Sequence, residues 1–359
     1  MRLPALLILL AACAAPPEDV RTVPVAPDLP PGSIPATPTS PSSLQRALAA
    51  ATDSTRLELA PGHYVLQSSA YTDPTCGNCQ DPATPVPGTL GLVVTGRGIE
   101  LVGTDPDSVF IHTGAGYGIL VEDCADCVIR GVTITGGVRD PDGQATNGAV
   151  VVRRSTAVLE SCRIRDNIGD STVVAETVVG IAGVVGREGA DFILRNCEIL
   201  RNSWDGVALY RGARAQIQDT VVDGVDKASG GRVGGGRGVG IGLTWDARAE
   251  ISGNLVARYW KGIGMFVDAQ ATVRFNVVED ILTWGIAYWG AGEGRAVGRI
   301  QENAIHQTGA CGVLISREEG GAEPPGFLRA NAIVQTGQTS RTTCSSTTAS
   351  PRGGPWRRN

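Results

Sequence analysis

A short unit recurs along most of this chain, and no other feature of the sequence restricts the possible folds as strongly. In residues 248–269, RAEISGNLVARYWKGIGMFVDA, an Asn stands in the turn between two apolar runs and a Gly opens a second strand. Residues 270–291, QATVRFNVVEDILTWGIAYWGA, repeat this order. The pattern extends from about residue 99 to about residue 338, and its apolar residues alternate as in strands rather than recur at helical spacing.

A polar turn residue recurs at intervals of 22 to 35 residues. Its positions are Ser161, Asn196, Asp219, Asn254, Asn276, Asn303 and Asn331. The large aliphatic residues three positions before most of them are Val158, Ile193, Ile251, Val273, Ile300 and Leu328. Asn tolerates the left-handed backbone of a tight bend, and stacked Asn amides can form a ladder. We therefore expect these residues to lie above one another at one corner of a repeating coil.

A glycine opens the second strand of each unit. These glycines are Gly118, Gly148, Gly180, Gly206, Gly240, Gly262, Gly285 and Gly312. We expect them to serve the same steric purpose at another corner. A chain that returns to the same apolar columns at every turn is a solenoid of stacked parallel strands, with neighbouring turns about 4.8 Å apart.

These columns, with the run LELAPGHYVL at residues 57–66, resemble the right-handed parallel β-helix, or pectin-lyase-like, superfamily. The resemblance covers residues 57–338 and implies an all-β fold, a single-stranded right-handed parallel β-helix solenoid. The segment SSLQRALAAAT, capped by Ser42 or Ser43, predicts an amphipathic N-terminal helix that covers the first coil. We predict one β-helix domain over residues 42–338, and we expect a monomer.

Both ends of the chain are predicted to lie outside the solenoid. Residues 1–13 are typical of a secretory signal, and their ending LAAC resembles a bacterial lipobox, which implies a lipid on Cys13. An ordinary signal with a chance Cys is the alternative. Residues 14–41 hold nine prolines and predict an extended tether. Residues 339–359 have four Arg and no acid, which predicts a disordered tail. We expect an exported protein whose lipid anchors it in the cell envelope and is its only contact with the membrane.

Nine cysteines in an exported chain favour disulfides. The candidates are two Cys-X-X-Cys pairs, Cys76 with Cys79 and Cys124 with Cys127, bonded locally or crossed. A zinc site built from the same four thiolates is the less favoured alternative. Cys162 and Cys197 follow the turn residues of successive coils and are expected to stack inside as buried thiols.

Unequal loop lengths predict a groove. Long insertions at residues 136–147, 166–179 and 223–239 stand beside coils whose corner is short. Binding residues concentrate on loops held by a rigid scaffold. Eight aromatic residues are the candidates for substrate binding: Trp204, Tyr210, Trp245, Tyr259, Trp260, Phe266, Trp284 and Trp289. Flat rings suit the apolar faces of sugar units. The alternative is that they cover apolar wall beneath the loops.

Titratable residues at the same corner are the catalytic candidates: Asp205, Asp226, Lys227, Arg237 and Lys261. Two facing carboxylates could hydrolyse a glycosidic bond. A polysaccharide lyase needs a base and a cation instead, and the only two lysines of the chain lie here. Solvated turn residues are the alternative. The adjacent Asp pair and Gly-His-Gly of polygalacturonases are missing, as is the Asp-Pro-His that alginate epimerases share.

The sequence therefore predicts a β-helix protein that binds a polysaccharide along a loop-flanked groove. Whether it also cleaves the polymer, as a lyase or a glycoside hydrolase, is left open. The alternative is a non-catalytic envelope or adhesion protein whose solenoid is a structural or binding rod. We predict no metal and no cofactor, apart from calcium if the protein is a lyase. With a net charge of −5, nothing suggests a nucleic-acid partner.

Overall fold

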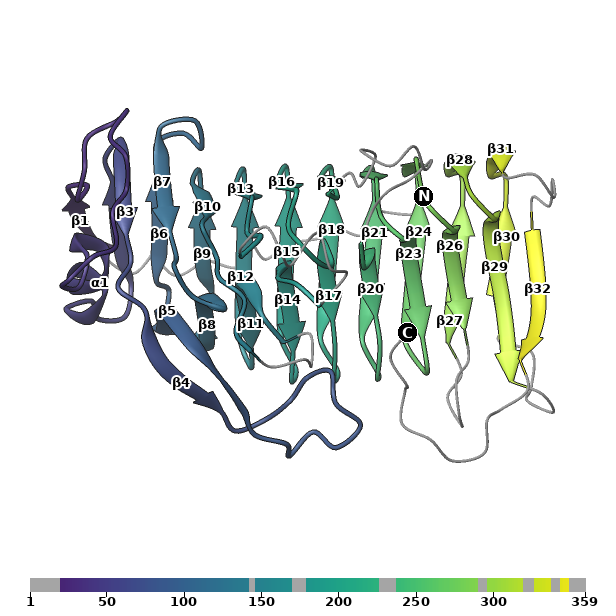
Figure 1. Cartoon of the computed structure of the whole chain (residues 1–359), viewed down its shortest axis with the longest axis horizontal. Coiled ribbons are helices and arrows are strands. Elements are labelled where there is room, and N and C mark those ends of the chain that lie inside the picture. Colours follow the sequence, from purple (N-terminus) through teal and green to yellow (C-terminus); the bar gives the residue numbers. More distant parts are fainter. Residues whose placement is uncertain are drawn as a thin grey trace, which may run out of the picture.

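The computed structural model describes residues 20–141, 146–169, 179–225, 237–289, 296–318, 326–336 and 343–348. Three long sheets run along one axis, and the chain passes from one to the next at every turn of the solenoid (Figure 1). Almost all strand pairs are parallel, for example Ile217 of one coil with Ile251 of the next. The predicted parallel β-helix is confirmed.

The first sheet contains β1 (Arg21–Val25), β2 (Thr55–Leu59), β6 (Glu100–Gly103), β9 (Cys127–Arg130), β12 (Thr156–Glu160), β15 (Asp191–Arg195), β18 (Arg214–Gln218), β21 (Arg248–Ser252), β24 (Gln270–Arg274), β27 (Val297–Gln301) and β30 (Gly326–Arg329). The second contains β3 (Gly62–Val65), β7 (Val109–His112), β10 (Thr133–Thr135), β13 (Arg163–Arg165), β16 (Glu198–Leu200), β19 (Val221–Asp223), β22 (Leu255–Ala257), β25 (Val277–Glu279), β28 (Ala304–Thr308) and β31 (Ala332–Thr336). The third contains β4 (Ser69–Asp73), β5 (Val86–Arg97), β8 (Tyr117–Ala125), β11 (Gly148–Arg153), β14 (Ala182–Arg187), β17 (Val207–Leu209), β20 (Val239–Leu243), β23 (Lys261–Phe266), β26 (Trp284–Trp289), β29 (Cys311–Glu318) and β32 (Thr343–Thr348).

Stacked aliphatic side chains fill the interior. In the first sheet, Ile217, Ile251, Val273 and Ile300 are fully buried and aligned on successive coils. Side chains alternate between the two faces of a strand, so the residues between them point outward. The core therefore grows by one layer with every coil.

The predicted turn column is correct from Asn254 onward. The side-chain amide of Asn254 donates to Asn276, that of Asn276 to Asn303, and that of Asn303 to Asn331, each at 2.9 Å. In the earlier coils the prediction is wrong by one residue. There, Cys162, Cys197 and Thr220 hold the ladder position, and the backbone N–H of Thr220 donates to Asn254 at 3.0 Å.

The residue with a left-handed backbone, that is with positive φ, comes directly before each residue of the stacked ladder. Ser161, Asn196 and Asp219 have φ values of 50°, 52° and 48°, and in later coils the same place is held by Gly253, Phe275, Glu302 and Ala330. A shift of one residue exchanges the two faces of a strand. Consequently Leu159 and Leu194 point into the core, whereas the predicted Val158 and Ile193 are half-buried.

The glycine column exists for a different reason from the one predicted. Its glycines do not have positive φ. A Cβ on Gly206 would lie 2.5 Å from the carbonyl oxygen of Gly240, and one on Gly262 would lie 2.2 Å from that of Gly285. A side chain at these two positions would therefore clash with the neighbouring coil. Gly148 and Gly180 are outside this column, since Ala149 and Gly183 occupy it on those coils.

The N-terminal helix is confirmed as α1 (Ser43–Ala49), with Ser42 as its cap and Leu44 fully buried.

The tether prediction is wrong for residues 21–25, because β1 pairs with β2 and extends the first sheet. The disordered-tail prediction is likewise wrong for residues 343–348, where β32 pairs with β29. In both segments, backbone hydrogen bonding to an open sheet edge outweighs a composition poor in apolar residues. The predicted signal and its Cys13 lie outside the described residues.

The four candidate cysteines form two local disulfides, Cys76–Cys79 and Cys124–Cys127, with Cα–Cα distances of 5.3 and 6.1 Å. Oxidised pairs leave no thiolates for the alternative zinc site. Cys162 and Cys197 are buried and adjacent, as predicted, with the backbone N–H of Cys162 donating to the sulfur of Cys197. In the part of the chain that the structure describes, no helix has both the length and the apolar character to cross a membrane.

Candidate functional site

Three outward-facing columns of the third sheet carry the candidate residues. The first column consists of Val239, Lys261 and Trp284, which pair on successive coils. Asp205, just before β17, holds the same place on the preceding coil. The middle column continues from Ala208 through Gly242, Gly264 and Ala287. The third column is Tyr210, Thr244, Phe266 and Trp289. Residues distant in sequence therefore meet because each coil returns to the same face.

These columns surround a pocket of about 150 Å³. Its lining comprises Asn78, Trp204, Asp205, Tyr210, Gly238, Val239, Gly242, Thr244, Trp260, Lys261 and Phe266. Six of these residues were predicted from the sequence as binding or catalytic residues. The concavity spans three coils, β17, β20 and β23, so it is a pocket rather than the long groove that the loop lengths predict.

Lys261 stands among aromatic rings. Its Nζ lies 4.3 Å from the ring centre of Trp260, 5.4 Å from that of Trp284 and 5.5 Å from that of Phe266. An ammonium group over aromatic faces is attracted by their quadrupoles. Burial lowers the pKa of Lys261, and the negative charge of Asp205 acts in the opposite direction.

Asp205 is the carboxylate of the pocket lining. Its side chain is 7% exposed, and Oδ1 accepts a hydrogen bond from the backbone N–H of Val239 at 2.7 Å. Burial raises its pKa to about 7, while the Val239 bond and the charge of Lys261 lower it. Gly238, with φ of 66°, makes this approach possible, because a Cβ there would lie 2.3 Å from Oδ1. No ion pair of the described residues joins Asp205 to Lys261, so the two charges act on each other at longer range.

Arg237 supports the pocket from behind. It is buried, its Nε donates to the carbonyl oxygen of Ser203 at 3.0 Å, and its guanidinium lies 5.6 Å from the ring centre of Trp204. Burial lowers its pKa to about 10, with a further contribution from the charge of Arg139. Arg237 therefore lies near Trp204 and outside the pocket lining, and its catalytic role stays a prediction.

The structure also corrects part of the aromatic prediction. Tyr259 is fully buried inside the solenoid and cannot bind a substrate. It fills the space left by the glycines of the second corner, since a Cβ on Gly206 would lie 2.8 Å from its hydroxyl oxygen. Trp245 lies beside the pocket, where the guanidinium of Arg211 covers its ring at 4.0 Å. Trp284 and Trp289 contact each other edge to face at 6.1 Å.

Two predicted catalytic residues, Asp226 and Lys227, lie outside the described residues. The described lining of the pocket therefore contains a single carboxylate and a single lysine. Among the described residues, no group of three or more His, Cys, Asp or Glu side chains is placed to hold a metal ion.

Sequence reasoning missed Asn78. It belongs to the loop of residues 74–85, which joins the antiparallel strands β4 and β5. Figure 1 shows β4 and this loop extending along the solenoid to about the level of β17. Tyr71 and Leu90 of the two strands pack against outward side chains of the third sheet, including Leu120, Val151 and Val185. No local sequence signal places this loop there, because Arg187 and Arg211, which bond to it, belong to later coils.

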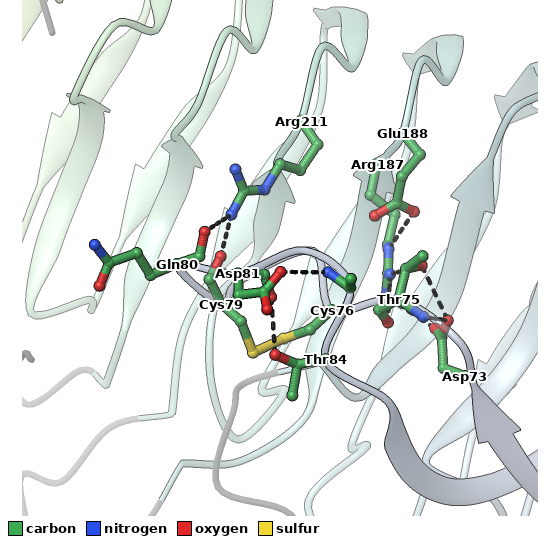
Figure 2. Close-up of a disulfide and its surroundings, with 11 residues drawn as sticks. Asp73, Thr75, Cys76, Cys79, Gln80, Asp81, Thr84, Arg187, Glu188 and Arg211 are labelled. Carbon is green, nitrogen blue, oxygen red and sulfur yellow. Dashed lines mark hydrogen bonds and ion pairs between the residues drawn. A yellow bond between two sulfur atoms is a disulfide. The ribbon is translucent and has the colours of Figure 1, made fainter.

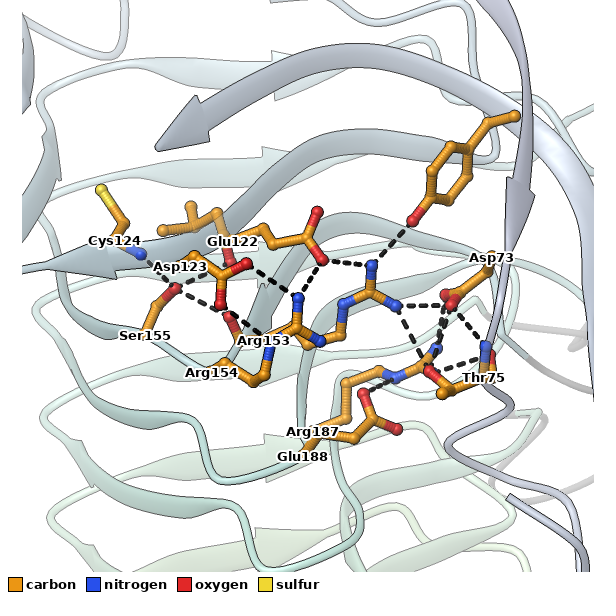
Figure 3. Close-up of polar contacts among 12 residues, drawn as sticks. Asp73, Thr75, Glu122, Asp123, Cys124, Arg153, Arg154, Ser155, Arg187 and Glu188 are labelled. Carbon is orange, nitrogen blue, oxygen red and sulfur yellow. Dashed lines mark hydrogen bonds and ion pairs between the residues drawn. The ribbon is translucent and has the colours of Figure 1, made fainter. Parts of the chain in front are cut away.

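Buried charges hold the loop in place (Figure 3). Asp73 at the end of β4 accepts from Arg153 at 2.5 Å and from Arg187 at 3.0 Å, and all three side chains are at most 2% exposed. Arg187 also donates to the carbonyl and hydroxyl oxygens of Thr75, each at 2.8 Å. The Cys76–Cys79 disulfide follows, and Arg211 donates to the carbonyl oxygens of Cys79 and Gln80 (Figure 2).

The chain belongs to the family described as right handed beta helix region. The model of this family matches residues 97–231 and 182–323, which together span more than half of the chain. A search of curated proteins finds no significant match.

Several solved structures are similar to this chain. An alginate lyase from Paenibacillus sp. has 14% identity and a TM-score of 0.43, over 87% of this chain and 99% of that one. The A-module of a mannuronan C-5 epimerase from Azotobacter vinelandii has 12% identity and a TM-score of 0.42, over 86% and 93%. A pectate lyase has 12% identity and a TM-score of 0.44, over 90% and 79%. Similarity at this level does not transfer an activity.

Proposed function

We propose that this protein binds a polysaccharide through the pocket on the outer face of the third sheet. The observation that carries the proposal is the convergence of four aromatic residues, Trp204, Tyr210, Trp260 and Phe266, on a pocket that also contains a lysine and a buried carboxylate. Ligand sites combine an apolar lining with a few polar groups that fix orientation. Aromatic rings match the C–H faces of a sugar ring, while Asp205, Lys261, Thr244 and Asn78 can bond to its hydroxyl groups.

Trp260 offers the most direct test. Its side chain is 44% exposed and lies at the pocket, whereas Phe275 is 57% exposed on another face of the solenoid. On a glycan array, Trp260→Ala is expected to weaken binding about tenfold, equivalent to ~1.4 kcal/mol. Phe275→Ala is the matched control and should bind like the wild type. Equal binding by wild type and Trp260→Ala would remove the pocket from the proposal.

A lyase activity is the second candidate function, and the electrostatics of the pocket favour it. A carboxyl with a pKa of about 7 can accept or donate a proton near neutral pH, and the nearby ammonium can stabilise a developing negative charge. Hydrolysis by two carboxylates has less support, since the described lining contains only Asp205.

Turnover of the glycans found on the array separates catalysis from binding. If Asp205 acts in proton transfer, Asp205→Asn should retain glycan binding and lose the release of unsaturated products, measured by ultraviolet absorbance. If the wild type binds glycans and releases no product, the protein is the binding rod of the alternative hypothesis.

We further propose that the protein is exported and anchored by a lipid on Cys13. The two disulfides support export, because such bonds persist in oxidising compartments. Metabolic labelling with a radioactive fatty acid should mark the wild type and leave Cys13→Ser unlabelled. Labelling of both chains would contradict the anchor at this position.

A further inference from the structure

The pocket is closed along the solenoid axis on its N-terminal side. Tyr71 of β4 and Leu90 of β5, the strands that the loop of residues 74–85 joins, pack on the outer face of the preceding coils, where Leu120, Val151 and Val185 are at most 1% exposed. Asn78 of this loop contributes directly to the pocket lining. The ion pairs of Asp73 and the bonds from Arg211 to the loop backbone hold this wall against later coils of the same sheet.

On the C-terminal side, two tryptophans outside the pocket lining lie on the next coil. Trp284 stands in the column of Lys261 and Trp289 in the column of Phe266, so they lie on opposite sides of the middle column. Their rings nevertheless meet, with centres 6.1 Å apart and an interplanar angle of 81°. Ala287 between them is fully buried. The pair therefore forms a barrier across the face, one coil beyond Lys261 and Phe266.

The space between these walls is small. Its volume is about 150 Å³ and its lining comes from three coils and Asn78, which suits one cyclic unit rather than a segment of an extended polymer. Its floor is at Gly242, because the ring of Phe266 lies over Gly264 on the next coil. A polymer lying along the axis would have to pass through the loop or through the tryptophan pair.

We infer that the pocket accepts one terminal or branching sugar unit of a glycan and excludes internal segments of an extended chain. This inference rests on the proposed function, and it adds the part of the polymer that is recognised. The walls leave the outward direction for entry, so the unit inserts end-on and the rest of the glycan projects away from the solenoid. Trp204 and Trp260 then contact the ring, and Asp205 and Lys261 contact its substituents.

The dependence of affinity on chain length tests this inference without any variant. The probes are defined oligosaccharides of one to six residues from the glycans that the full-length wild-type chain binds, each prepared with a free or a 4-O-methylated non-reducing end. An end-on pocket predicts that the dissociation constant changes less than about threefold between two and six residues. It also predicts that end methylation weakens binding of unbranched probes at least tenfold.

A tenfold or greater gain in affinity from two to six residues, unaffected by end methylation, would overturn the inference and leave the proposed function intact. Binding to no glycan at all would overturn both. Removing a wall provides a second measurement: Trp289→Ala should open the C-terminal side and introduce a dependence on chain length that the wild type lacks. Phe275→Ala is the control and should behave like the wild type. A Trp289→Ala protein that folds and keeps the wild-type length dependence would contradict the barrier.

Discussion

The two halves of the outer face of the third sheet have the same backbone and opposite roles. On β8, β11 and β14 the middle column carries Leu120, Val151 and Val185, and Tyr71 of β4 and Leu90 of β5 pack on this cluster. On β20 and β23 the same column carries Gly242 and Gly264, and Gly242 lines the pocket instead. Side-chain size in one column therefore distinguishes the face that binds its own chain from the face that is left for a ligand.

The third column changes in the same direction. Arg153 and Arg187 on the covered coils pair with Asp73 at the end of β4, whereas Tyr210, Thr244 and Phe266 follow on the next three coils. A buried charge is tolerated only with a partner of opposite charge, and Asp73 is the partner that both arginines share, beside Glu122 for Arg153 and Glu188 for Arg187. The aromatic and hydroxyl side chains that follow have no such requirement and can face a ligand.

The largest expected effect comes from breaking the covered half. Asp73→Ala would leave two arginines buried without their shared carboxylate, and we expect a loss of about 3–5 kcal/mol in the free energy of unfolding. Urea denaturation followed by circular dichroism measures it. Glu58→Ala is the matched control, because it removes an exposed ion pair with Arg56 and should cost less than about 1 kcal/mol. Equal effects for the two variants would contradict the role of the buried network.

The next largest effect concerns Asp205 in the open half and the dependence of stability on pH. The pKa of Asp205 is about 7 in the folded protein and 3.8 ordinarily, so between pH 4 and 7 the folded state keeps a proton that the unfolded state has lost. Stability contributed by this group therefore falls as pH rises through that window, by up to about 4 kcal/mol. Asp205→Asn should unfold at a higher urea concentration than the wild type at pH 8. The two proteins should converge near pH 4, and parallel pH profiles would contradict the raised pKa.

The smallest effect on stability comes from making the open half resemble the covered half. Gly242→Val introduces the side chain found at Val151, and its Cβ would lie 3.4 Å from Val239, an ordinary contact. We expect a change in unfolding free energy within about 1 kcal/mol and a loss of glycan affinity of at least tenfold. Thr272→Val on the outer face of the first sheet serves as the control and should leave affinity unchanged. Full affinity in Gly242→Val would show that the ligand does not contact this floor.

The candidate site was predictable wherever its residues share the coil repeat. Asp205, Lys261, Trp204 and Trp260 fall on short corners or strand starts of successive units and Phe266 ends one of these strands, so the repeat itself brings them together. Tyr259 was predicted wrongly because it stands beside Trp260 in sequence, whereas neighbouring residues at a corner point in opposite directions. Asn78 was not predictable, since its place depends on ion pairs with residues of much later coils.

The sequence alone determined the solenoid. Each coil repeats the same alternation of apolar and polar residues, so the apolar side chains lie on the same face of the strand in every coil. It determined the stacked amides from Asn254 onward for the same reason. Only the tertiary structure decided the register of the earlier turns, the strands within the proline-rich and C-terminal segments, and the walls of the pocket. These features depend on contacts between segments that share no repeat, in which a backbone edge or a buried charge finds a partner that local composition does not indicate.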